Sequence, residues 1–95
     1  MTAAHIRNLM DGLAPEMVEI EVVGYGPGVS ILGKGSTAEA DIAALTAKHV
    51  RFVACQKAMH AHKMTEADLI PGVGTVPSGI VEVVTKQEEG WTYIP

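Results

Sequence analysis

The spacing of apolar side chains alternates between helical and strand periods along the whole chain. Residues 3–13 repeat apolar side chains every three or four positions, which predicts an amphipathic helix. Residues 17–23 alternate apolar with mostly acidic positions, which predicts a strand that is at an edge or half covered. Residues 50–55 form a short apolar run typical of a buried strand, and helical spacing resumes from residue 56 to residue 64.

The second half of the chain continues the alternation. Ser36 and Glu39 have the spacing of a capping box and predict a helix to about Lys48, and Thr65 with Asp68 predicts a second, shorter helical turn. A brief strand at 73–76, a helix from Ser78 to Gly90 and a final strand at 91–94 complete the order. This order predicts one domain, residues 1–95, of α/β class: a three-layer α/β/α fold with a mostly parallel sheet of four to five strands.

Composition and charge exclude several classes of protein. Apolar residues make up 47% of the 95 residues and aromatic residues only 4%, so the core must be packed from aliphatic side chains. A net charge of -4 argues against a nucleic-acid surface, which needs a basic stripe. A single cysteine cannot form an internal disulfide, and no apolar run approaches membrane-spanning length or a signal peptide. We therefore expect a cytoplasmic protein without a membrane partner.

The only cysteine, Cys55, falls where the strand period gives way to the helical period. In an open α/β sheet this junction lies at the carboxyl edge, where such folds collect their ligands. The N–H groups of Gln56 and Lys57 at the start of the helix would stabilise a thiolate, and Lys57 or His60 would add positive charge. The alternative is that Cys55 is a buried apolar filler without chemistry.

The neighbouring histidines do not predict a metal site. His60 and His62 are two residues apart and therefore point to different sides of a helix, whereas a metal pair prefers a spacing of three or four. We read both as solvated or charge-tuning groups, and the sequence gives no reason to expect a metal or another cofactor.

Together, several segments resemble the DsrE/DsrF-like family over essentially all 95 residues. The segments that carry the resemblance are Ile6–Leu9, Gly24–Val29, Cys55, Met64–Val73, Val76–Glu82 and Gly90–Tyr93. The resemblance implies a small α/β/α protein with a parallel five-stranded sheet, usually a homo-oligomer. Better understood members of this family pass sulfur between partner proteins as a cysteine persulfide, and Cys55 matches the family's cysteine position.

The resemblance and the strand order together predict a pocket around Cys55. Its walls would be two glycine-containing loops at neighbouring strand ends. These loops are Gly26, Pro27 and Gly28 after the first strand, and Pro77, Ser78 and Gly79 before the last helix.

One departure concerns the beginning of the chain. The family normally has a strand before its first helix, inside the sheet, whereas this sequence begins in the helix. A missing strand would leave backbone hydrogen-bonding groups of its neighbours unpaired. We therefore expect a homo-oligomer, dimer to hexamer, that shares aliphatic residues of the first and last helices: Ile6, Leu9, Ile80 and Val84.

These observations favour a sulfur carrier of sulfurtransferase type that holds a persulfide on Cys55 and exchanges it with donor and acceptor proteins. The alternative is a non-catalytic oligomeric module that binds a small anion or serves assembly, with Cys55 as a buried filler. A redox sensor that forms an intermolecular disulfide is a third reading.

Overall fold

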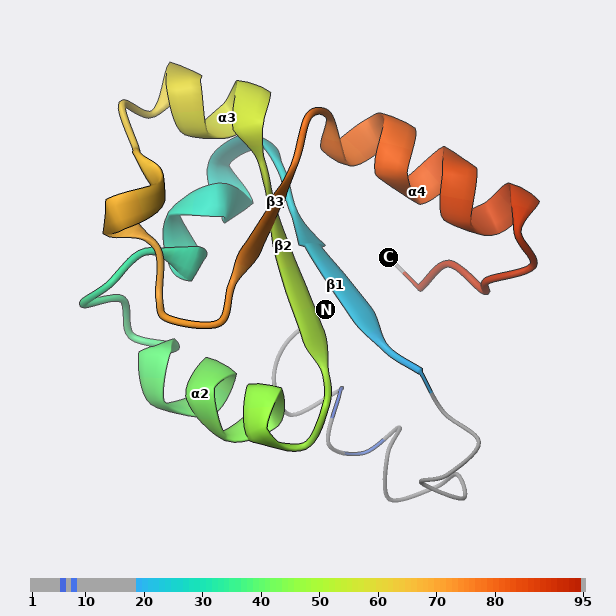
Figure 1. Ribbon diagram of the computed structural model, residues 1–95, viewed down its shortest axis with the longest axis horizontal. Helices are drawn as coiled ribbons and strands as arrows, with labels where there is room; N and C mark the ends of the chain where they lie inside the picture. Colours follow the sequence, from blue (N-terminus) through green and yellow to red (C-terminus); the bar gives the residue numbers. More distant parts are fainter. Residues whose placement is uncertain (1–5, 7, 9–18, 95) are drawn as a thin grey trace.

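The computed structural model describes residues 6, 8 and 19–94. Ile6 and Asn8 are helical, and the rest of the helix expected at 3–13 lies outside the described residues, as do residues 17 and 18 of the first expected strand. The described chain contains a small parallel sheet with helices on both faces (Figure 1).

Three parallel strands form the sheet, in the order β1-β2-β3. They are β1 (Glu21–Gly24), β2 (Arg51–Cys55) and β3 (Gly74–Val76). Glu21 pairs with Arg51 in the first ladder and Cys55 with Val76 in the second. All pairs are parallel because a helical crossover separates each strand from the next. The expected α/β class with a parallel sheet is therefore confirmed.

The helical segments lie on opposite faces of the sheet. The crossover from β1 to β2 contains the 3-10 helix η2 (Gly26–Leu32) and α2 (Glu39–Ala47). The crossover from β2 to β3 contains α3 (Gln56–Ala61) and the 3-10 turn η3 (Glu66–Asp68). The last helix, α4 (Gly79–Glu88), covers the other side of the strands, away from η2 and α2 (Figure 1).

The main core lies between the sheet and the crossover helices. It is almost wholly aliphatic, as the low aromatic content requires, and Phe52 is its one aromatic side chain among the described residues. Val29 of η2 and Ala54 of β2 are fully buried, and Ile20 and Val22 pack against this core from one face of the first strand segment. Because side chains alternate along a strand, Glu21 and Val23 face α4 instead.

The two predicted capping boxes have different outcomes. Thr65 and Asp68 form theirs, with the Thr65 N–H donating to Asp68 Oδ2 at 2.8 Å, so that prediction is confirmed. The box of Ser36 and Glu39 does not form, because α2 begins later, with Ala38 at its N-cap. The Ser36 hydroxyl instead donates to the Ile31 carbonyl at 2.7 Å and ties the preceding turn to η2.

The strand expected at 91–94 is not formed. Gly90 has a φ of +99° and turns the chain back after α4. The Trp91 N–H then bonds to the Lys86 carbonyl at 2.9 Å, which belongs to the helix end and not to a ladder. The apolar pattern of these residues fits a strand, but a strand also needs another strand to pair with, and none of the described strands pairs with them.

Candidate functional site around Cys55

Cys55 is the last residue of β2, and α3 begins at the next residue. Its backbone is still extended, with φ -70° and ψ 118°, so the change from strand to helix occurs within one residue. The predicted junction is therefore confirmed. Cys55 is 6% exposed, and its thiol lies at the carboxyl edge of the sheet, below the surface.

The beginning of α4 lies directly against Cys55. A Cβ added to Gly79 would be 3.3 Å from the Cβ of Cys55, 3.2 Å from Val23 Cγ1 and only 2.8 Å from the Cβ of Tyr25. No side chain fits at this position without moving these neighbours. Glycine is therefore what allows the backbone of α4 to approach the cysteine.

Opposing effects set the pKa of the Cys55 thiol. Burial is the largest single effect and raises the pKa, because it disfavours the charged thiolate. The backbone N–H groups of Gly79, Ala58 and Lys57 point at the sulfur and lower the pKa, and the Lys57 ammonium lowers it further. Together these donors outweigh burial, so the pKa lies below the usual range of a thiol.

Of the three residues predicted to stabilise the Cys55 thiolate, only Lys57 is among the groups that lower the pKa of the thiol. Lys57 acts on the thiol through both its N–H and its charge, as expected. The Gln56 N–H is not among the groups that shift the pKa of the Cys55 thiol. The side-chain amide of Gln56 instead donates to Thr75 Oγ1 at 3.1 Å and so joins α3 to β3. His60 is exposed on α3 and is likewise absent from those groups.

The two predicted wall loops differ in their relation to Cys55. Gly79 touches the cysteine, and Ser78 caps α4 by accepting a hydrogen bond from the Val81 N–H at 3.4 Å. Pro77 is exposed in the same turn. The other loop forms the start of η2, where Pro27 is exposed, and nothing within 4 Å would meet a Cβ on Gly26 or Gly28. Gly79 lies close to both Cys55 and Tyr25, the residue that directly precedes this loop.

No sequence pattern predicts that the N–H groups of Ala58 and Gly79 lower the pKa of the Cys55 thiol. Ala58 is the third residue of α3, which begins at Gln56. The first four N–H groups of a helix have no partner within the helix, so the Ala58 N–H is one of those free to point at the thiol. Gly79 belongs to a different helix, 24 positions away, and only the parallel arrangement of β2 and β3 brings its N–H to the thiol.

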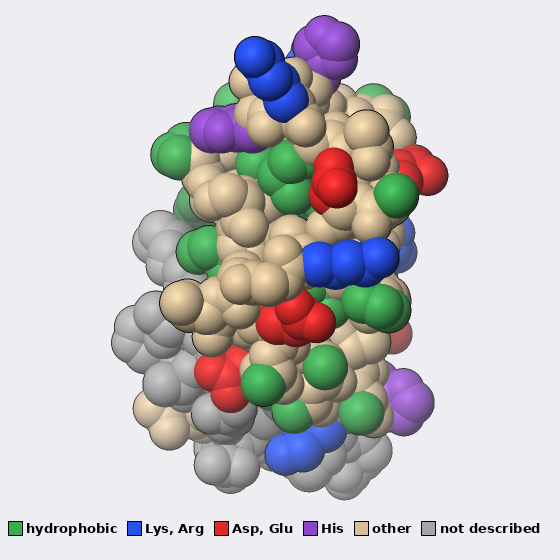
Figure 2. Space-filling model, turned by 90° about the vertical axis from the view of Figure 1, so that its left-hand side faces the viewer, with side chains coloured by type: hydrophobic (Ala, Val, Ile, Leu, Met, Phe, Trp, Pro, Cys, Tyr) green, Lys and Arg blue, Asp and Glu red, His purple; other side chains and the backbone are tan. Residues whose placement is uncertain are grey.

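The surface near this site carries positive charge. Four cationic or titratable side chains on α3 and the turn after it are exposed: Lys57, His60, His62 and Lys63. Figure 2 shows lysine and histidine side chains together at the end of the molecule that α3 forms. A surface of this kind favours the approach of anionic groups to the edge that holds Cys55.

Within residues 6, 8 and 19–94, no three His, Cys, Asp or Glu side chains come together as metal ligands. In the same part of the chain, no helix has the length and apolar character needed to cross a membrane.

The fold and this site define a small α/β protein with a cysteine at the carboxyl edge of a parallel sheet, and the thiol of this cysteine has a lowered pKa. The family model described as the DsrE/DsrF-like family matches residues 1–95, and the chain belongs to this family. Membership suggests a role of the sulfur-relay type.

A solved structure supports the same assignment. The protein MTH1491 from Methanobacterium thermoautotrophicum is 43% identical in sequence, and the match covers 97% of this chain and 81% of that one, with a TM-score of 0.92. That protein is itself described as being of unknown function. No curated protein matches the chain.

Proposed function

We propose that this protein is a persulfide carrier in which Cys55 receives a sulfur atom from one protein and gives it to another. The observation that carries the proposal is the set of N–H donors on the sulfur. Gly79, Ala58 and Lys57, from two different helices, all direct their N–H groups at Cys55. A structural filler has no need of such an arrangement, whereas a thiolate is stabilised by it.

The transfer requires no oxidant or cofactor. The Cys55 thiolate attacks the outer sulfur of a donor persulfide, a new S–S bond forms on Cys55, and the donor S–S bond breaks to release the donor as its thiolate. The hydrogen of the donor persulfide stays on the transferred sulfur during the attack and is lost to water when the new persulfide ionises. An acceptor thiolate then attacks that outer sulfur and returns Cys55 to its thiolate form.

The same N–H groups suit the loaded state. A persulfide is anionic near neutral pH, and the N-termini of α3 and α4 provide donors for its charge. Lys57 on α3 and Lys63 in the turn after it are exposed, and their positive charge would favour the approach of a negatively charged partner site. The partners would be donor and acceptor proteins, and the net charge of -4 argues against nucleic acid.

Mass spectrometry of the intact protein tests the proposal. After incubation with a small-molecule persulfide donor and removal of excess donor, we expect one added sulfur atom, about 32 Da, that a reducing thiol removes. Cys55→Ser is the matched control and should gain nothing. An unmodified wild-type protein under conditions that load a reference persulfide carrier would contradict the proposal.

A second candidate function follows from the burial of Cys55. At 6% exposure the thiol has the environment of an apolar filler, which fits a non-catalytic module that binds a small anion at the helix N-termini or serves assembly. The two candidates differ in thiol accessibility: a carrier thiol reacts within minutes in the folded protein, whereas a filler reacts only after unfolding. Reaction with an aromatic disulfide reagent, with and without denaturant, separates them.

A further inference from the structure

The helix α4 has aliphatic side chains on its outer face and charged side chains on the face toward the sheet. Three aliphatic side chains are between 48% and 66% exposed: Ile80, Val81 and Val84. Within this described helix, Gly79 is the one buried residue, and Glu82 and Lys86, three and seven positions later, act on Glu21 of β1. Burial of apolar side chains therefore contributes little to holding α4 on the sheet, and its polar contacts become correspondingly important.

The carboxyl group of Glu21 lies under the inner face of α4. Its side chain is 3% exposed, and the Glu82 carboxyl hydrogen-bonds to it. Two carboxyl groups can share a hydrogen bond only while at least one of them carries a proton, because two carboxylates have no donor between them. The contact between α4 and β1 therefore depends on a bound proton.

We propose that Glu21 and Glu82 form a pH-sensitive contact, which holds α4 against the sheet while it is protonated and, as it ionises, releases α4 and uncovers Cys55. Two carboxylates at a buried contact repel each other and lose the hydration that they would have in water. The inference concerns the regulation of the thiol, and the release of α4 does not depend on whether Cys55 carries sulfur.

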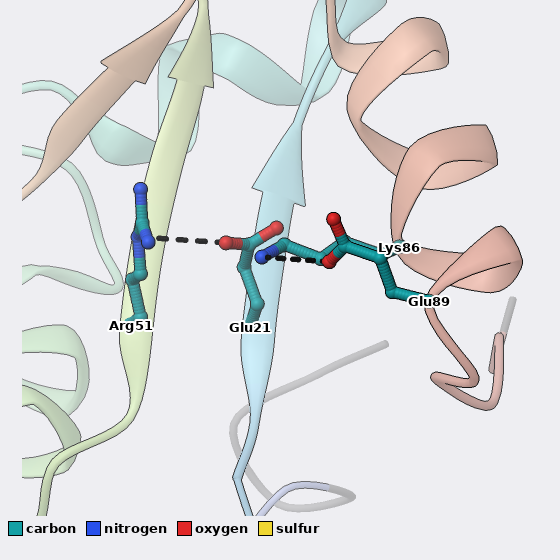
Figure 3. Close-up of polar contacts among 4 residues, drawn as sticks. All are labelled: Glu21, Arg51, Lys86 and Glu89. Carbon is teal, nitrogen blue, oxygen red and sulfur yellow. Dashed lines mark ion pairs between the residues drawn. The ribbon is translucent and has the colours of Figure 1, made fainter.

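The cations around Glu21 do not replace this proton. Figure 3 shows Arg51 of β2 on one side of Glu21 and Lys86 of α4 on the other. The Arg51 Nε lies 3.4 Å from Glu21 Oε2, but the Arg51 side chain is 62% exposed, so water and salt screen its charge. The Lys86 ammonium is shared with Glu89, at 3.7 Å, and with the Trp91 ring, whose centre is 4.9 Å away.

The change in charge falls near neutral pH. Burial raises the pKa of Glu21 from 4.5, and the Glu82 carboxyl raises it further, to about 7, although Arg51 and Lys86 act in the opposite direction. Within the described residues, these three side chains are the charged groups that act on Glu21. Tyr93, in the segment after α4, has its hydroxyl hydrogen-bonded to another tyrosine instead. The contact therefore loses its proton between about pH 6 and pH 8.

Release of α4 would act directly on the cysteine. Gly79, the first residue of α4, directs its N–H at the Cys55 sulfur, and a Cβ added to Gly79 would lie 3.3 Å from the Cβ of Cys55. A helix of 10 residues is marginal in water without tertiary contacts, so a released α4 would also lose its internal hydrogen bonds. The thiol, which is 6% exposed, would lose part of its cover and one of its N–H donors.

Hydrogen exchange of the α4 amides measures this release, when each rate is divided by the intrinsic exchange rate at the same pH to give a protection factor. With a pKa of about 7 in the docked state and 4.5 in the released state, the released fraction should increase about tenfold between pH 6 and pH 8. We therefore expect the protection factors of residues 83–86 to fall about tenfold over this range. Unchanged protection factors would overturn the proposal.

Glu21→Gln is the decisive variant, because glutamine can donate to the Glu82 carboxylate but cannot ionise. Its α4 amides should have the same protection factors at pH 6 and pH 8. Glu82→Gln supplies a donor to an ionised Glu21 and should reduce the pH effect, so the test stands even if Glu21→Gln fails to fold. Glu88→Gln, exposed on α4, is the control and should keep the full effect. A full pH effect in Glu21→Gln or in Glu82→Gln would overturn the proposal.

The amides of the central strand β2 separate release of α4 from unfolding of the whole domain. They should have higher protection factors than the α4 amides at both pH values, because α4 opens without the rest of the sheet. Equal protection factors in α4 and β2 would mean that the domain opens as one unit, and would overturn a local contact.

The rate of reaction of Cys55 with a bulky maleimide tests the effect on the thiol. Between pH 6 and pH 8 this rate should rise about tenfold more in the wild type than in Glu21→Gln, because ionisation of the thiol is common to both proteins. An equal rise would overturn the link between α4 and Cys55. None of these measurements requires bound sulfur, so a protein that fails to take up a persulfide can still pass or fail them.

Discussion

The N–H of Gly79, at the start of α4, faces the sulfur of Cys55, at the end of β2. A Cβ on Gly79 would lie 3.3 Å from the Cβ of Cys55, so the two backbones are as close as a residue without a side chain permits. This contact joins the C-terminal helix to the cysteine and connects the stability of α4 with the reactivity of the thiol.

Substitution of Gly79 should therefore affect both properties. We expect Gly79→Ala to lower the free energy of unfolding by about 1–3 kcal/mol, because the new methyl group would overlap Tyr25 and crowd Val23. It should also raise the pKa of the Cys55 thiol by moving the N–H away. Gly28→Ala is the matched control, since nothing lies within 4 Å of a Cβ there. Denaturant unfolding and alkylation rates measure the two effects, and an unchanged thiol pKa would contradict the assigned contact.

The Cys55 thiol should ionise more readily than a free thiol. The rate of alkylation plotted against pH should have its midpoint clearly below about 8.5, because three N–H groups and Lys57 stabilise the thiolate. Lys57→Gln should raise that midpoint and slow the reaction at pH 7, while Lys48→Gln, at the end of α2, should leave it unchanged. A wild-type midpoint at or above the free-thiol value would refute the activated cysteine.

The Ser78 cap should contribute modestly to stability. The hydrogen bond from the Val81 N–H is long, at 3.4 Å, so we expect Ser78→Ala to cost about 0.5–1 kcal/mol, in the lower part of the usual range for a cap. Ser78→Asp keeps an acceptor at the same position and should cost less. Thermal unfolding of the three proteins distinguishes a cap from a residue of no local importance, for which both variants would behave like the wild type.

Glu21 should make stability depend on pH between about 4.5 and 7. The pKa of this carboxyl rises from 4.5 to about 7 on folding, so the folded state binds more protons than the unfolded state in that window. The free energy of unfolding should therefore fall as pH rises through it, by on the order of 2 kcal/mol. Glu21→Gln should flatten this dependence, whereas Glu88→Gln, exposed on α4, should not.

The expected homo-oligomer remains a prediction, and its surface requires a correction. Ile6 is 2% exposed and packs in the core, so it is not available to a partner, and Leu9 lies outside the described residues. Ile80 and Val84 are 66% and 48% exposed, and Val81 between them is 61% exposed. These three side chains form an aliphatic face on the outside of α4, which is the surface we now expect partners to share.

Sedimentation at micromolar concentration measures this association. We expect a species of at least twice the 10.0 kDa chain, and Val84→Glu should shift it toward the monomer. Thr85→Glu is a matched control that adds the same charge to an exposed position of α4. A well-folded wild-type monomer under these conditions would refute the prediction.

Local patterns were sufficient to predict much of this fold. The change from strand to helical spacing at Cys55 predicted the junction to the residue, because both periods arise from backbone geometry that neighbouring residues share. The capping box of Thr65 and the cap of Ser78 were likewise readable, since each bond spans three residues. The parallel α/β class followed from the order of these elements.

The tertiary structure decided what depends on residues far apart in the chain. Residues 91–94 carry a strand pattern but form no strand, because pairing requires a neighbour that local sequence cannot supply. The acidic position Glu21 is covered by α4, although its alternation with apolar residues is equally compatible with a solvated face. The N–H of Gly79 reaches Cys55 only because β2 and β3 are adjacent. The sequence therefore determined that the cysteine lies at the end of a strand. The packing of two helices at one edge of the sheet determined the lowered pKa of its thiol.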